Sequence, residues 1–147
     1  MPGIIVGIDG SGHSQKALEW ALKEAALRRE PLTVLAVHEA VRGYFSGPTR
    51  YTGDPEQTEK TTAAAKAETE KVLATLPEDA RPESVTVHAL HGFPAEELVK
   101  ASQDADLIVV GSRGAGGFAR LTMGSVALQL VEHAACPVTI VRPAHKH

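Results

Sequence analysis

The sequence predicts an α/β domain with a mainly parallel sheet and helices on both of its faces. Short runs rich in β-branched residues alternate with longer segments of helical periodicity along the chain. The first run, residues 4–8, is apolar throughout, which is typical of a strand covered on both faces. The 147 residues, 43% of them hydrophobic, can bury one sizeable core, so we expect a single domain over residues 1–147.

The first strand and the first helix are predicted over residues 4–8 and about 14–29. The strand reads Ile-Ile-Val-Gly-Ile and stops at Asp9-Gly-Ser-Gly, a sequence typical of a turn. The apolar residues of the helical segment are spaced by three and four positions, and they are Leu18, Ala21, Leu22 and Ala25. Ser11 and Ser14 are the two candidates for the N-cap of this helix.

A second strand and a second helix follow, with a long polar segment between them. Residues 32–38 have the β-rich composition of a strand, and residues 56–76 carry an apolar helical stripe that Pro77 helps to end. The segment between them, residues 42–55, is polar and rich in Gly and Pro. Loops of this length usually carry a function or are disordered, and the sequence leaves open whether this one covers a ligand or contacts a partner.

The second half of the chain repeats the alternation. Three further strands are predicted over residues 84–90, 106–110 and 137–141. A helix begins at Pro94, where proline in the first turn removes no hydrogen bond. The last helix is marked by apolar residues at helical spacing, namely Ala127, Leu130, Val131 and Ala134. We expect the tail, residues 143–147, to be frayed.

Composition excludes several classes of function. Fifteen Lys and Arg residues against eighteen Asp and Glu give a net charge of -3, so no basic surface for a nucleic acid or an anionic membrane is expected. No apolar run approaches the roughly 20 residues that a bilayer crossing needs. The first residues lack a secretion signal and Cys136 is the only cysteine, which predicts a cytoplasmic protein with a buried, unreactive thiol.

The most informative segment is glycine-rich and runs from Gly111 to Ser125. It leaves a predicted strand and delivers Gly124-Ser125 to the start of a helix. Glycines let backbone amides approach an anion, and the first amides of a helix carry partial positive charge, so this arrangement suits a phosphate group. The alternative is that the segment only closes a strand-to-helix connection, with Ser125 as the N-cap.

The spacing of this segment is specific. Gly111 is followed after two residues by Gly114 and after nine more by Gly124-Ser125. This pattern resembles the signature of the ATP-binding branch of the universal stress protein family. The resemblance extends along nearly the whole chain, through Val-Gly-Ile-Asp-Gly-Ser at the first strand, Val-His at the end of the second, and Cys-Pro-Val-Thr-Ile-Val-Arg at the last. It implies a doubly wound, five-stranded parallel sheet of order 3-2-1-4-5, with the reversal between the first and fourth strands.

The resemblance also implies a set of nucleotide-binding residues. Those implied to line the adenine and ribose region are Gly7, Ile8 and Asp9. Those implied to contact the base through backbone groups are Ile8, His38 and Glu39. Those implied to follow the ribose and the first phosphates are Gly111, Arg113 and Gly114. Those implied to hold the outer phosphates are Gly124, Ser125 and Val126.

Asp9 also has a rationale of its own, because an acceptor beside a switch point can take a ribose hydroxyl or the adenine amino proton. The alternative role is an Asx-turn or a cap for the first helix. Arg113 likewise has two candidate roles, because a guanidinium suits a phosphate and an arginine on a loop is often simply solvated.

Other nucleotide and hydrolase motifs are absent. The chain has no Walker loop, and Gly12-His-Ser-Gln-Lys16 fails the nucleophile-elbow pattern at Lys16. His88 and His91 are the closest histidine pair before the tail, but positions i and i+3 of a strand point to opposite faces, so no metal site is expected there.

The resulting hypothesis is a stress-response protein that binds ATP, with Mg²⁺ accompanying the triphosphate. No general base, nucleophile or carboxylate pair is evident, so at most slow ATP hydrolysis is expected. The alternative is an interaction module whose site is vestigial or prefers another adenine nucleotide such as cyclic AMP. The resemblance further implies a homodimer through the fifth strand, since residues 138–142 form an apolar sheet edge. The sequence does not identify a protein partner.

Overall fold

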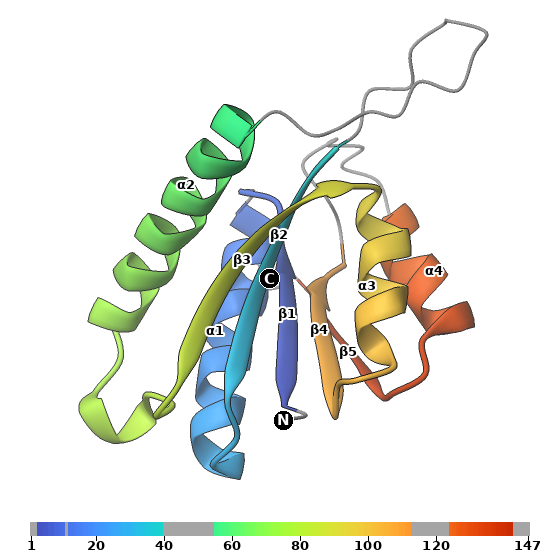
Figure 1. The fold of residues 1–147 in the computed structure, drawn as a ribbon. Helices are drawn as coiled ribbons and strands as arrows, with labels where there is room; N and C mark the ends of the chain where they lie inside the picture. Colours follow the sequence, from blue (N-terminus) through green and yellow to red (C-terminus); the bar gives the residue numbers. More distant parts are fainter. Residues whose placement is uncertain (1–2, 11, 40–54, 113–123, 143–147) are drawn as a thin grey trace, which may run out of the picture.

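The sheet of this protein has five parallel strands in the order β3-β2-β1-β4-β5, as predicted (Figure 1). A computed structural model describes residues 3–10, 12–39, 55–112 and 124–142. The strands are β1 (Ile4–Ile8), β2 (Leu32–Glu39), β3 (Val85–Gly92), β4 (Leu107–Gly111) and β5 (Val138–Val141). The order of the strands reverses between β1 and β4, so the chain winds outward from the centre of the sheet in both directions.

Helices cover both faces of the sheet. They are α1 (Gly12–Arg28), α2 (Pro55–Ala74), α3 (Pro94–Ser102) and α4 (Ser125–His133), with a short 3-10 helix over Glu78–Ala80. Figure 1 shows α1 and α2 on one face and α3 and α4 on the other. No helix among the described residues has the length and apolar content needed to cross a membrane.

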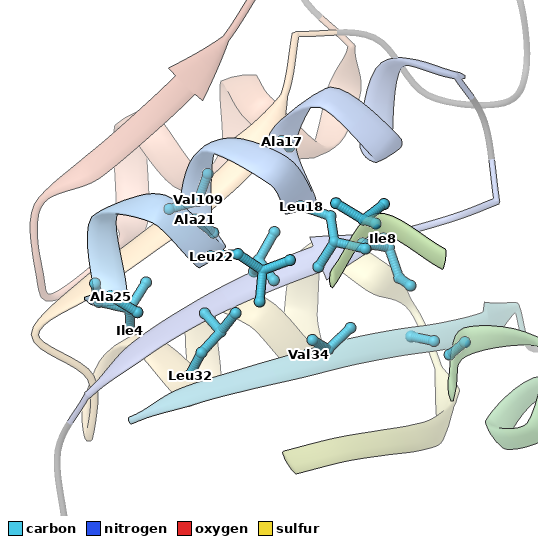
Figure 2. Packing of buried hydrophobic residues seen from close by; sticks show 14 of the residues in the cluster. Ile4, Ile8, Ala17, Leu18, Ala21, Leu22, Ala25, Leu32, Val34 and Val109 are labelled. Atoms are coloured by element: carbon cyan, nitrogen blue, oxygen red, sulfur yellow. The ribbon is translucent and has the colours of Figure 1, made fainter. Parts of the chain in front are cut away.

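The larger of two hydrophobic cores lies under α1 and α2. The inward face of β1, with Ile4 and Val6, packs against Leu18 and Leu22 of α1 (Figure 2). Alanines at positions such as Ala21 let the helix approach the sheet closely. Each of these residues is fully buried, which explains why the helix α1 could be predicted from the spacing of its apolar residues.

The smaller core lies under α3 and α4. Leu98 of α3 and Leu130 of α4 pack with Ile108 and Val110 of β4. Leu107 and Val109 of the same strand face the larger core, so these four residues of β4 are covered on both faces of the sheet. In β1 the alternate positions are only partly buried, so the coverage predicted for both of its faces is complete on the α1 side alone.

The predicted bounds differ from the observed ones mainly at the carboxyl ends of the strands. β2 and β3 run one and two residues further than expected, because their ladder continues to the pair Glu39↔Gly92. The helix α1 begins at Gly12, so Ser14 lies inside its first turn and is not its N-cap. The other cap candidate, Ser11, lies outside the described residues, as do most of the 42–55 segment and the tail 143–147.

Candidate functional site

The candidate site lies at the carboxyl ends of the strands, where β1 and β4 separate. These two strands pair from Ile4↔Leu107 to Val6↔Val109, and no pairing between them is present beyond that point in the described residues. The chain continues through Gly7 and Ile8 on one strand and through Gly111 on the other. In doubly wound sheets a ligand binds at such a reversal, because the connections leave in opposite directions and open a crevice.

The strand β2 extends past β1 at this end of the sheet. Pairing between β1 and β2 stops at Ile8↔Ala36, whereas β2 remains paired with β3 through His38↔His91 and Glu39↔Gly92. Across the described part of the chain, no strand lies beside the other edge of Val37 to Glu39. Backbone N–H and C=O groups alternate between the two edges of a parallel strand, so this edge can meet the polar edge of a planar ligand.

The turn after β1 is held by a buried hydroxyl. The Asp9 amide donates a hydrogen bond to Ser14 Oγ at 3.2 Å, and Ser14 is buried in the first turn of α1. Gly10 has a φ of 83°, a left-handed conformation that side chains rarely adopt. The turn therefore leaves Asp9 exposed beyond the carboxyl end of β1, with its backbone oriented by Ser14.

A second carboxylate, Glu68 of α2, lies within electrostatic range of Asp9. Partial burial raises the pKa of Glu68, the negative charge of Asp9 raises it further, and Lys71 lowers it. Glu68 was not predicted from the sequence, because nothing in the helical pattern distinguishes it from the other acidic residues of α2. Asp9 and Glu68 thus form a negatively charged pair that disfavours further negative charge nearby.

The start of α4 is tied to the end of β4. Gly124 is the N-cap residue, and its amide donates to the Ser112 carbonyl at 2.7 Å. The Ser112 amide in turn donates to the Val141 carbonyl of β5 at 3.0 Å. These bonds hold the first turn of α4 at the same edge of the sheet as the crevice.

The first turn of α4 offers donors to an anion. The leading amides, from Ser125 to Ala127, have no acceptor within the helix, and the helix dipole gives this end partial positive charge. Gly124 has no side chain to cap them, so the interpretation of Ser125 as the N-cap is wrong. Ser125 is exposed and adds a hydroxyl beside the amides.

At two of the predicted site residues, Gly7 and Ile8, the Cα–Cβ direction points into a hydrophobic core. A Cβ atom on Gly7 would lie 2.9 Å from Leu98 Cδ1 of α3, so this glycine allows the helix to pack against β1. The Ile8 side chain is 6% exposed and belongs to the larger core, which leaves its backbone for a ligand. Gly111 ends β4 and pairs with Val141, while Arg113 and Gly114 lie outside the described residues.

His38 takes part in a contact that the sequence analysis did not foresee. Its Nδ1 lies 3.1 Å from Nδ1 of His91, and its Nε2 lies 3.0 Å from Oγ1 of Thr58 on α2. His88 and His91 are both on β3 and point to opposite faces, so the neighbour of His91 is His38 across the ladder. Aligning the predicted starts of the second and third strands, at residues 32 and 84, would have placed His38 beside Leu90, so this contact depends on the observed register.

The described residues hold no group of three or more potential metal ligands. Cys136 is partly buried against the smaller core, and its thiol donates to the Pro137 carbonyl at a sulfur to oxygen distance of 3.4 Å. Burial raises the pKa of this thiol, which keeps it protonated and unreactive near neutral pH. Cys136 is therefore not part of the candidate site.

A hollow of about 450 Å³ lies at the opposite end of the strands. It is lined by residues that precede or begin the strands, namely Gly3, Ile5, Pro31, Thr33, Ser84, Thr86 and Asp104. No helix N-terminus of the described chain belongs to this lining, and its one charged residue is a carboxylate. This end of the sheet is therefore a poor match for a phosphate group.

Solved structures share this architecture. A universal stress protein in complex with cAMP has a TM-score of 0.70 and 22% identity, with 96% of each chain covered. The universal stress protein of Archaeoglobus fulgidus in complex with dAMP has a TM-score of 0.61 and 24% identity, with 95% of this chain and 97% of that chain covered. At these identities the similarity shows the fold.

The sequence comparison adds the family. A universal stress protein of Mycobacterium tuberculosis is 35% identical over 144 residues, which are 95% of this chain and 47% of the relative. This chain thus spans about half the length of the mycobacterial relatives that it matches. The family model described as the universal stress protein family matches residues 2–142. With the predicted strand order also present, this chain belongs to the universal stress protein family.

Proposed function

We propose that this protein binds an adenine nucleotide, ATP, in the crevice between the carboxyl ends of β1 and β4. The observation that carries the proposal is that two complementary surfaces meet at one edge of the sheet. The first turn of α4 offers amides and a hydroxyl to an anion, while the ends of β1 and β2 offer backbone groups to a base. The family members with bound cAMP and dAMP support an adenine nucleotide as the ligand class.

The proposed roles follow from this geometry. The base lies along the edge of β2 that faces away from β3, near His38 and Glu39, and beside the backbone of Ile8. The Asp9 carboxylate accepts a hydrogen bond from a ribose hydroxyl, because it is exposed beyond the carboxyl end of β1. The outer phosphates lie against Gly124, Ser125 and Val126.

Two further assignments extend these roles beyond the described residues. Arg113 and Gly114 belong to the glycine-rich segment between Gly111 and Gly124, and we assign them to the inner phosphates. This assignment rests on the family spacing.

We propose that ATP acts mainly as a ligand and is hydrolysed slowly at most. Phosphoryl transfer needs a group that orients the attacking water and cations that neutralise the developing charge. The described residues at the start of α4, from Gly124 to Ala127, supply only one hydroxyl and backbone amides. Mg²⁺ would reach the site with the triphosphate, since it is usually held by substrate phosphates and few protein carboxylates.

The output we propose is a change of conformation or of protein partner during a stress response in the cytoplasm. The single cysteine supports a reducing compartment. A second candidate is that the site prefers a cyclic nucleotide, which the family member with bound cAMP favours. A site built for cAMP would use one phosphate contact and gain nothing from the β- and γ-phosphates of ATP.

Calorimetric titration of nucleotide-stripped protein tests this proposal. ATP, ADP and cAMP are titrated in parallel, with and without Mg²⁺. We expect saturable binding of ATP, stronger than that of cAMP, because the first turn of α4 holds the outer phosphates. Tighter binding of cAMP supports the second candidate, and no binding of any of the three contradicts both.

We also propose that two copies associate through β5. This strand lies at the edge of the sheet, and its residues Val138–Val141 are all partly buried in the single chain. On α4, which packs against β5, Leu128 is 46% exposed and Val131 is 58% exposed. An edge strand beside exposed apolar side chains is a favourable surface for a second chain.

Light scattering on two variants tests the dimer. We expect the mass of two chains for the protein, a shift toward one chain for Val131→Glu, and no shift for Leu27→Glu. Leu27 is the matched control because it is an exposed leucine, at 80%, on α1, which covers the opposite face of the sheet from α4. A monomeric protein at micromolar concentration, or equal behaviour of both variants, contradicts the β5 interface.

A further inference from the structure

Three side chains from three separate elements meet at the carboxyl end of β2, beyond its last pair with β1. His38 of β2 contacts His91 of β3 through their Nδ1 atoms, 3.1 Å apart, with ring centroids separated by 4.8 Å. The other ring nitrogen of His38 contacts the Thr58 hydroxyl of α2 at 3.0 Å. The ladder between β2 and β3 and the start of α2 are therefore joined at His38.

The contact between the two Nδ1 atoms needs a hydrogen on one of them and a lone pair on the other. Two neutral imidazoles satisfy this, and so does one neutral ring beside one protonated ring. When both rings are protonated, each Nδ1 carries a hydrogen and the two positive charges repel, so the contact is lost. The Thr58 hydroxyl can donate or accept, and it therefore fits either form of Nε2 on His38.

The two histidines lie at the end of β2, so a change in their positions would displace the backbone beside the proposed base site. Along β2, alternate side chains point to one face, and Leu32, Val34 and Ala36 on that face belong to the larger core under α1 and α2. His38 continues this row just beyond the point where β1 stops pairing with β2. Its side chain thus holds the segment of β2 that we assign to the base.

We propose that His91 and Thr58 are positioning residues for the nucleotide site, and that protonation of the pair His38 and His91 weakens nucleotide binding. This inference rests on the proposed function, since it concerns the β2 side of the same site. Neither residue needs to touch the nucleotide. They act by keeping the end of β2 in one place relative to β1.

Few other charged groups approach the pair from the described elements. Within one turn of Thr58 on α2, the charged residues Glu56, Glu59 and Lys60 are exposed. On β3 the other histidine, His88, is exposed on the opposite face. Of the described carboxylates, Asp9 follows β1, Glu68 of α2 interacts electrostatically with Asp9, and Glu97 of α3 has its Oε1 3.1 Å from where a Cβ on Gly92 would lie. A pH response that disappears with His91 therefore belongs to the pair and not to these groups.

The test compares the pH dependence of ATP affinity in three proteins. They are the wild type, His91→Gln, and His88→Gln as the matched control on the same strand. ATP itself gains a proton on acidification, but this change is common to all three proteins and cancels in the comparison. Between about pH 7.5 and about pH 5.5, where histidine titrates, we expect affinity to fall about threefold to tenfold more in the wild type and His88→Gln than in His91→Gln.

The outcomes separate this inference from the proposed function. Equal pH profiles in all three proteins, or a uniform loss of affinity in His91→Gln at every pH, overturn the positioning role. A wild type that binds no nucleotide at either pH overturns the proposed function instead. The imidazole nitrogen resonances of the wild type then test the pair directly. At about pH 7.5 we expect one Nδ1 of the pair to carry a hydrogen and the other to carry a lone pair, and two Nδ1 atoms in the same form overturn the pairing.

A second variant covers the case in which His91→Gln fails to fold. Thr58→Val removes the hydroxyl that contacts His38 and leaves both rings in place. We expect this variant to bind ATP more weakly than the wild type at about pH 7.5 and to keep part of the pH response. Wild-type affinity and an unchanged pH profile in a folded Thr58→Val protein overturn the role of Thr58.

Discussion

Ser125→Asp is expected to weaken ATP binding by about tenfold or more while leaving the protein at least as stable as the wild type. A carboxylate at the first position of α4 would lie where the outer phosphates are proposed to bind, and like charges at such a distance repel strongly. The same carboxylate interacts favourably with the helix dipole, by about 0.3 to 1 kcal/mol. Calorimetric titration with ATP and thermal unfolding measure the two effects.

The opposite signs of the two effects make this variant informative. Gln129→Glu is the matched control, because Gln129 is exposed on the same helix one turn further from its start. It adds the same negative charge to α4 outside the first turn. Equal losses of ATP affinity in the two variants would indicate general charge repulsion, and no loss in Ser125→Asp would remove α4 from the site.

Gly7→Val is expected to lower the free energy of unfolding by about 1 to 3 kcal/mol through overpacking. A Cβ atom at this position would lie 2.9 Å from Leu98 Cδ1 and 3.4 Å from Val110 Cγ1, before the two methyl groups of valine are added. Leu98 is 3% exposed and has little room to move away. Denaturant unfolding of the variant and the wild type measures the difference.

A double-mutant cycle tests whether Leu98 is the side chain that excludes a larger residue at position 7. Leu98→Ala removes the side chain that the new methyl groups would meet, so Gly7→Val should cost less in that background, because valine then fills the space. Additive costs would show that Leu98 is not what excludes a side chain at position 7. Wild-type ATP affinity in folded Gly7→Ala would further show that this glycine serves packing.

Local patterns in the sequence predicted the elements well, and their physical basis is visible in the structure. The helix α1 could be predicted because its apolar residues, such as Leu18 and Leu22, are fully buried against one sheet. The strand β4 could be predicted because both of its faces are covered, which requires a continuous apolar run. The order of the strands could not be predicted in the same way, because the periodicity of a segment does not encode which strands pair. That part of the prediction came from the family resemblance.

The candidate site was predictable only in part. Spacing indicated Gly124 and Ser125, but the absence of a side-chain cap on α4 became visible only with the geometry of its first turn. The resemblance assigned Gly7 to the adenine and ribose region, and the structure adds that its missing side chain makes room for Leu98, a residue 91 positions away in the chain. The contacts of His38 with His91 and Thr58 depend on strand register and helix placement, which single-sequence patterns do not specify.

The central claim is that the nucleotide lies at the carboxyl end of the sheet, with its phosphates on α4 and its base beside β2. Amide chemical shifts of the protein, followed during titration with ATP, test this most directly. We predict the largest changes at Ser125 and Val126 in the first turn of α4 and at Asp9 and His38 at the ends of β1 and β2. Changes confined to the hollow at the other end of the strands, around Gly3 and Thr33, would contradict the account.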